Sequence, residues 1–193
     1  MRTLIALLLT LAALPCRGQF TLGAASYVSS FSVTTNGVPA DVKQDYAEGA
    51  WEAGIDYFNW YYYASWFIAS NSYTLHAISF KVITNGVGTF TVTPHLFNDN
   101  AGQPGTLLDT GTAQSITTAP TSADWWRFEG FDCSLTNGSR YWVSMQASVW
   151  AASYQLIWGA QVEPDVGVWR SDNGTSWSVG LTTIKGLFRT YGQ

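Results

Sequence analysis

Four acidic residues are the first groups whose chemistry could support catalysis. Glu129 and Asp132 lie close together in the middle of the chain, and Glu163 and Asp165 lie nearer the C-terminus. Two carboxyl groups that face each other across a sugar can hydrolyse a glycosidic bond, one as general acid and the other as base or nucleophile. Spacing along the chain does not place any two of these groups face to face. A glycoside hydrolase using an acidic pair is therefore an alternative hypothesis.

The two histidines, His76 and His95, offer little for nucleophilic or metal chemistry. A serine nucleophile needs a base beside its hydroxyl, and no Gly-x-Ser-x-Gly elbow accompanies either histidine. Strand alternation places His95 on the polar side of its segment, where we expect it to face solvent. The histidines and Cys133 do not show the spacing of zinc ligands. We therefore predict a protein without a catalytic constellation.

An oxygen-rich run over residues 98–105 (NDNAGQPG) is the one segment that could hold a cation. Ca²⁺ takes oxygen ligands from carboxylates, amides and backbone carbonyls. Asp99 and Asn100 are accordingly weak candidates for ligands of a structural calcium ion. The same residue types are also those that a tight turn requires.

Aromatic residues are the most informative feature of the composition. The chain has ten each of Trp, Tyr and Phe, against 9 basic and 13 acidic residues. We expect the core to take up part of these rings and the rest to reach the surface, where Trp and Tyr anchor ligands and flat sugar faces can stack on them. The candidate ligand-binding residues are Trp125, Trp150, Tyr154, Trp158, Glu163 and Trp169.

Side-chain parity separates the two rings of the Trp125-Trp126 pair. Trp126 shares the parity of Phe128, an expected core residue, so Trp125 is predicted to point outward. Packing of such rings into the core, or over the edges of a sheet, is the alternative for each of them.

The elements that must position these residues are short strands. Residues 88–97 alternate apolar and polar side chains, and Pro94 predicts a sheet edge or a bulge there because it lacks an N–H. Residues 41–53 are expected to form a loop with at most one helical turn. The other predicted strands cover residues 20–28, 57–69, 78–82, 126–129, 141–145, 154–158, 166–169 and 182–189. About ten short strands predict a single antiparallel β-sandwich, jelly-roll-like in outline.

The N-terminus predicts export. A basic start (Met1-Arg2), an apolar run over residues 4–14 and a small-residue cleavage pattern ending at Gly18 form a secretory signal peptide over residues 1–18. The run is shorter than the roughly 20 residues that cross a bilayer. We therefore expect no transmembrane segment in the mature chain, residues 19–193, and a secreted, extracellular or cell-surface location.

Net charge and cysteine content limit which partners and disulfides the mature chain can have. Losing Arg2 and Arg17 with the signal peptide leaves 7 basic residues, so the mature charge is 7 − 13 = −6, which disfavours nucleic acid. Cys133 becomes the only cysteine and cannot form an intramolecular disulfide. A mature length of 193 − 18 = 175 residues fits one domain. Low charge with exposed apolar surface also favours self-association.

Four segments together resemble the choice-of-anchor R type domain of bacterial exported and surface proteins. They are residues 73–80 (YTLHAISF), 98–105 (NDNAGQPG), 135–143 (LTNGSRYWV) and 171–177 (SDNGTSW). The resemblance implies an exported, non-catalytic β-sandwich, and it transfers no catalytic residue.

The leading hypothesis is a secreted or cell-surface β-sandwich that binds an extracellular polysaccharide or a cell-envelope component through exposed aromatic residues. The alternatives are a structural or self-assembling envelope component and the glycoside hydrolase described above.

Overall fold

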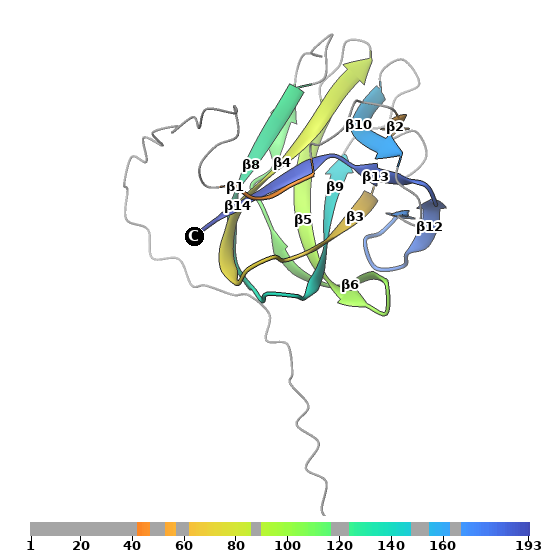
Figure 1. Ribbon diagram of the computed structural model, residues 1–193. Helices are drawn as coiled ribbons and strands as arrows, with labels where there is room; N and C mark the ends of the chain where they lie inside the picture. The colour runs from red at the N-terminus through yellow and green to blue at the C-terminus, as the bar shows by residue number, and fades with distance from the viewer. Residues whose placement is uncertain are drawn as a thin grey trace, which may run out of the picture.

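The computed structural model describes residues 42–46, 53–56, 62–85, 90–116, 124–147, 155–162 and 167–193. The predicted signal peptide and the strand expected over residues 20–28 lie outside these ranges. Every regular element in the described ranges is a β-strand, and all strand pairs are antiparallel. Two sheets pack against each other, which confirms the predicted all-β sandwich (Figure 1).

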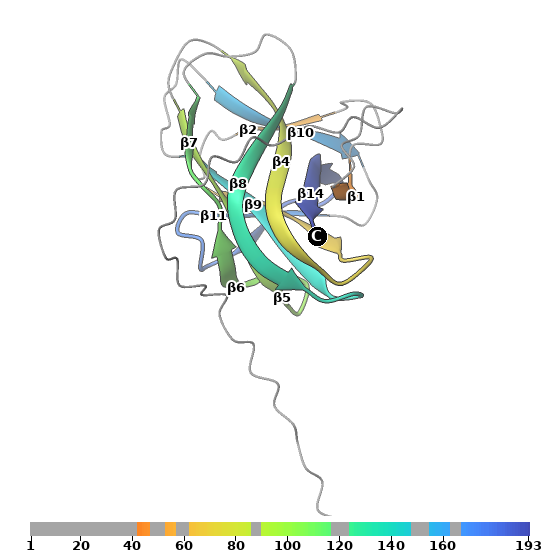
Figure 2. The same ribbon diagram turned by 90° about the vertical axis from the view of Figure 1, so that its left-hand side faces the viewer.

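The first sheet runs in the order β1 (Val42–Asp45), β14 (Phe188–Gly192), β4 (Tyr73–Asn85), β10 (Gln155–Val162) and β13 (Ile184–Gly186). Off this path, β2 (Ala53–Asp56) pairs with β10, and β8 (Asp124–Leu135) pairs with β4. Figure 2 shows β4 and β8 as two long curved strands lying side by side.

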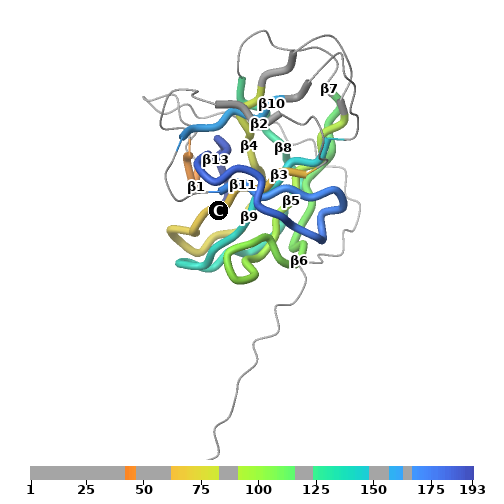
Figure 3. Tube along the Cα trace, turned by 90° about the vertical axis from the view of Figure 1, so that its right-hand side faces the viewer, coloured from red at the N-terminus to blue at the C-terminus, as the bar shows by residue number. Residues whose placement is uncertain are grey.

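The second sheet runs in the order β12 (Ser178–Leu181), β11 (Val168–Ser171), β3 (Tyr62–Ile68), β9 (Arg140–Ala147), β5 (Phe90–Asn100) and β6 (Gln103–Thr110). β7 (Gln114–Ile116) also pairs with β5. The hairpin of β5 and β6 and the turn between β11 and β12 are far apart in sequence but belong to this same sheet (Figure 3).

The main core lies between the sheets and is built by alternate residues of each strand. Phe67 of β3 meets Phe188 of β14 edge to face, with ring centroids 5.8 Å apart, and so joins the two sheets. Phe80 meets Trp158 in the same way at 5.1 Å. Cys133 is buried in this core as a small apolar residue. Such edge-to-face pairs stabilise a core beyond the area that they bury.

Two local predictions can be compared with the strand pairing. Residues 42–45 form strand β1 rather than a loop or helical turn, because they pair with the C-terminal strand β14. Pro94 lies inside the sheet rather than at its edge, and the pairing of β5 shifts register at this point, between Val92↔Gln114 and His95↔Thr110, as the bulge alternative predicts. The Pro94 carbonyl accepts a hydrogen bond from Gly111 N at 3.0 Å, and its missing N–H falls where β6 has ended and β7 has not begun.

The described residues contain no helix with the length and apolar character needed to cross a membrane.

Candidate functional site

A second group of aromatic residues covers the face of the β3–β9–β5 sheet that points away from the core. Because successive strand residues point to opposite faces, this sheet presents rings on both sides. Trp142 of β9 lies between Trp66 of β3 and Phe97 of β5, which are its cross-strand partners. We call the group the outer aromatic cluster: Ala64, Trp66, Phe97, Trp142, Trp169 and Trp177.

The rings of this cluster meet edge to face. Trp142 contacts Trp169 with centroids 6.4 Å apart at 84°, and Phe97 contacts Trp177 at 5.2 Å and 82°. Tyr62 contacts the other side of Trp177 at 6.3 Å and 75°. The buried indole Nε1 of Trp177 has no hydrogen-bond partner within the described ranges, and the rings of Phe97 and Tyr62 hold this side chain in place.

The turn after β11 places the Trp177 ring in the outer aromatic cluster. Asn173 Oδ1 accepts hydrogen bonds from the backbone N–H groups of Thr175 and Ser176, both at 2.9 Å. Gly174 has a φ of 72°, in the left-handed region that favours glycine. A side chain at this position would also press on the Tyr62 ring, with its Cβ 3.1 Å away. The turn is therefore closely specified by its own residues.

A polar pocket of about 600 Å³ lies between this turn and the β5–β6 hairpin. Small-molecule pockets are roughly 300–1,000 Å³. Two segments of the family resemblance, separated by about seventy residues, meet at this point. The lining residues are Asn98, Asp99, Asn100, Gln103, Pro104, Gly105, Thr106, Thr175, Ser176 and Trp177.

The Asp99 carboxylate links the β5–β6 hairpin to the outer aromatic cluster through hydrogen bonds. Its Oδ1 accepts a hydrogen bond from the Trp142 indole Nε1 at 2.8 Å, and its Oδ2 accepts one from Gly102 N at 3.2 Å. The Arg140 guanidinium lies 3.9 Å from the same carboxylate and stacks on the Trp66 ring at 4.6 Å. The carboxylate thus fixes the β5–β6 turn and the ring beneath it.

The calcium prediction at Asp99 and Asn100 gains no support from this geometry. Both carboxylate oxygens of Asp99 accept hydrogen bonds from the protein, and the contacts are those of a tight turn. Within the part of the chain that the structure describes, no group of three or more His, Cys, Asp and Glu residues could hold a metal ion.

The predicted ligand-binding residues do not form one site. Trp158 is fully buried in the core and donates from Nε1 to Leu187 O at 2.8 Å, so its assignment as a ligand contact is wrong. Its strand, β10, lies inside the first sheet, and the closely approaching Gly186 leaves room for the ring. Trp169 is half-buried in the outer aromatic cluster. Trp150, Tyr154 and Glu163 lie outside the described residues.

Trp125 lies on the outer face of the opposite sheet, as parity predicted, while Trp126 packs against the core. The Trp125 ring is half-buried because two cations cover it. Arg189 Cζ lies 4.2 Å and Lys81 Nζ 5.9 Å from the ring centroid. Arg189 is held in turn by Asp45, with Nε 3.0 Å from Oδ1. The Trp125 ring, on which a sugar would stack, is therefore contacted by cationic side chains of the protein itself.

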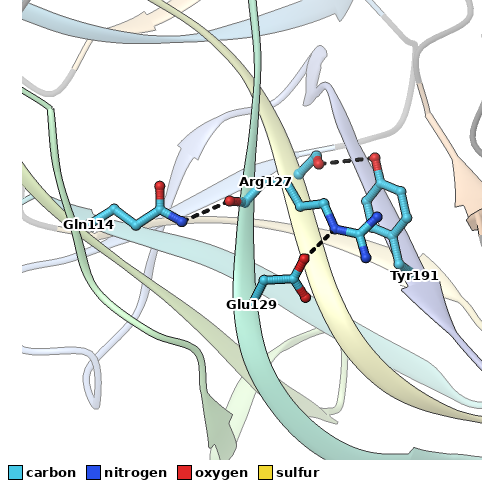
Figure 4. Close-up of polar contacts among 5 residues, drawn as sticks. Gln114, Arg127, Glu129 and Tyr191 are labelled. Atoms are coloured by element: carbon cyan, nitrogen blue, oxygen red, sulfur yellow. Dashed lines mark hydrogen bonds and ion pairs between the residues drawn. The ribbon is translucent and has the colours of Figure 1, made fainter. Parts of the chain in front are cut away.

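The same outer face holds a second cation–ring pair, drawn in Figure 4. The Arg127 guanidinium lies 4.0 Å from the centroid of the buried Tyr191 ring, and its Nε bonds Glu129 Oε1 at 2.6 Å. Ser79 donates to the Tyr191 hydroxyl at 3.0 Å, and Gln114 donates to the Arg127 carbonyl at 2.8 Å. Glu129 is therefore part of a structural ion pair on this face.

Of the four predicted acidic residues, Glu129 and Asp132 lie within the described ranges. Asp132 is exposed on β8, and its backbone N–H donates to Asp109 Oδ2 at 2.8 Å. Asp165 lies outside the described residues, as Glu163 does.

For the residues whose burial is described, the prediction that surplus aromatic rings are exposed is wrong, while Trp150 and Tyr154 lie outside these residues. None of the aromatic side chains whose burial is described is exposed, and the exposed large apolar residues are all aliphatic. Most of these described rings lie in the core, in the outer aromatic cluster or on the face covered by cations. The turn that holds Trp177 belongs to the segments of the family resemblance, but Trp177 is not among the predicted ligand-binding residues. The available signal was a tryptophan directly after a turn rich in Asn, Gly and Ser.

His95 is buried rather than solvent-facing, because the outer face of its sheet is covered. Its ring lies 5.5 Å from Tyr62, and its two nitrogens bond Thr110 Oγ1 at 3.1 Å and Gln146 Oε1 at 3.2 Å. Burial lowers the pKa of His95, and the hydrogen bond that His95 Nε2 donates to Gln146 Oε1 opposes this effect only in part. The neutral imidazole is therefore favoured in the folded protein.

Replacing Asp99 by alanine should destabilise the protein by about 1–3 kcal/mol, because it leaves the buried Trp142 indole N–H without its acceptor. Urea unfolding of the mature chain measures this change. Asp172→Ala, at an exposed acid in the neighbouring turn, is the matched control and should stay within about 0.5 kcal/mol. Equal effects of the two substitutions would contradict the role given to Asp99.

His95 should make folding stability depend on pH. Because the folded pKa lies below the ordinary value of 6.5, the unfolded chain binds the proton more readily. The contribution of His95 to the free energy of unfolding is fully present above pH 6.5. It is lost as the pH falls from there through the lowered pKa of the folded state. Thermal melts across this range should show a shallower dependence of stability on pH for His95→Gln than for wild type. An unchanged pH dependence in His95→Gln would contradict the assignment.

Comparison of the chain with protein-family models, with curated proteins and with solved structures finds no match. The resemblance to choice-of-anchor R type domains therefore stays a prediction, and the function has to be argued from the pocket itself.

Proposed function

We propose that the protein is a secreted or cell-surface, non-catalytic β-sandwich that binds an extracellular glycan in the pocket between the β5–β6 hairpin and the turn after β11. The observation that carries the proposal is the half-buried Trp177 ring at the edge of a pocket lined by amide and hydroxyl side chains. A sugar presents flat C–H faces and many hydroxyl groups. A ring beside convergent polar groups complements both features.

The rigidity of the pocket also favours binding. Asp99 holds the hairpin through Trp142, and Asn173 shapes the turn that carries Trp177. Groups that are positioned before the ligand arrives lose less conformational entropy on binding. The predicted signal peptide and the family resemblance support the extracellular part of the proposal.

Trp177→Ala should weaken binding to the glycans that the wild-type mature chain binds on an array by about tenfold or more, as loss of an aromatic anchor does. Trp125→Ala is the matched control, since it removes another half-buried indole on the opposite sheet, and it should leave binding unchanged. Thermal melts of both variants verify folding.

Two outcomes would overturn the proposal. One is the absence of wild-type binding to any polysaccharide or cell-envelope extract. The other is a loss of binding in Trp125→Ala that Trp177→Ala does not share.

A self-assembling envelope component is the second candidate function, and the edge strand β12 favours it. β12 pairs only with β11 among the described strands, and it exposes Val179 (47%) and Leu181 (41%). An unpaired strand edge with apolar side chains is a template for pairing with another chain.

If β12 mediates assembly, sedimentation of the mature chain at increasing concentration should show oligomers, and Val179→Lys should shift them to monomer because a lysine blocks edge pairing. Thr182→Lys, beside β12 in an exposed turn, adds the same charge and should leave assembly intact. A strict monomer at high concentration would exclude this candidate.

A further inference from the structure

We infer that the pocket selects uncharged sugars bearing hydroxyl or acetamido groups over acidic sugars, an inference that rests on the proposed glycan binding. It follows from the chemistry of the lining residues and from where the protein places its cations.

The free polar groups of the pocket are neutral. The side chains of Asn100, Gln103 and Ser176 have no hydrogen-bond partner within the described ranges. An amide presents both donors and an acceptor, and a hydroxyl presents one donor and two lone pairs. This set matches sugar hydroxyl and acetamido groups, which donate and accept in the same way.

Asp99 is the one charged residue that lines the pocket, and its carboxylate already has partners within the protein. Asp99 accepts hydrogen bonds from Trp142 Nε1 and Gly102 N, and Arg140 lies 3.9 Å from its Oδ1. Arg140 is in turn stacked on Trp66 and is not part of the lining. The pocket therefore holds an acid whose partners are in place and offers no cation of its own to a ligand.

A carboxylate or sulfate on the ligand would enter this pocket without a counter-charge. Removing such a group from water without a partner is costly, and the strong partners for it are arginine and lysine. The chain also carries a net charge of −4, which repels anions at longer range.

Apart from Arg140, which is paired with Asp99, three cations that an acidic glycan could use lie on the opposite sheet. Lys81, Arg127 and Arg189 project from the outer face of the first sheet, where they contact Trp125 and Tyr191. Neutral and acidic ligands would thus be expected on opposite sheets, which makes the two outcomes separable.

Calorimetric titration of the mature chain with matched six-sugar probes tests the inference. The neutral probes are cellohexaose, xylohexaose, mannohexaose and chitohexaose, and the acidic probes are hexagalacturonate and a heparin hexasaccharide. At least one neutral probe should bind, and its affinity should change little between about 0.1 M and about 1 M NaCl, where the Debye length falls from about 10 Å to about 3 Å. Gln103→Ala should weaken that binding by about tenfold.

A gain of function gives a sharper test. Gln103→Lys should lower affinity for the neutral probe and raise affinity for an acidic probe by about tenfold, in a manner that added salt removes. Thr182→Lys adds the same charge outside the pocket and is the matched control, expected to leave both affinities unchanged.

Each remaining outcome overturns a defined part of the account. Wild-type binding to an acidic probe that Lys81→Gln abolishes and Gln103→Ala leaves intact would overturn the inference while leaving glycan binding in place. Neutral binding that neither Gln103→Ala nor Asn100→Ala alters would overturn the assignment to this pocket. Failure of every probe to bind would overturn the proposed function as well.

Discussion

The buried indole N–H of Trp142 needs a hydrogen-bond acceptor, and the rest of the site depends on Asp99 supplying it. Trp142 is 1% exposed, so an unpartnered N–H there would be costly. By accepting this hydrogen bond, Asp99 holds the β5–β6 hairpin against the outer aromatic cluster. Trp177 arrives from the turn after β11 and packs against Phe97 in the same cluster. The pocket is the space that remains between these two anchored loops.

The same constraint explains how so many rings fit into a protein with few charges. A sheet has two faces, and in the β3–β9–β5 sheet both carry aromatic rings. One face fills the core, and the other is covered by its own tryptophans. On the opposite sheet the outer rings are covered by cations instead, as Arg127 covers Tyr191 and Arg189 covers Trp125. A high aromatic content is thus satisfied with no exposed ring among the residues whose burial is described.

The strands could be predicted from the sequence because their cause is local: alternation over residues 88–97 and the parity of Trp125 and Trp126 depend on a few neighbours each. The site could not be predicted in this way. Its two loops are distant in sequence, and only the pairing of β11 with β3 and of β5 with β9 brings them to one end of the sheet. The predictions that His95 faces solvent and that Trp158 contacts a ligand are wrong for a related reason. Parity gives the face of a strand to which a side chain points, but it does not show what covers that face or which strand lies inside the sheet.

The central claim is that the pocket beside Trp177 binds a neutral sugar. An amide and indole NMR titration of the mature chain with chitohexaose and cellohexaose tests it most directly, because it maps contact without any substitution. The account predicts that the largest shifts occur at the Trp177 indole and at the side-chain amides of Asn100 and Gln103. Shifts concentrated at the Trp125 indole and along β4, β8 and β14 would contradict it.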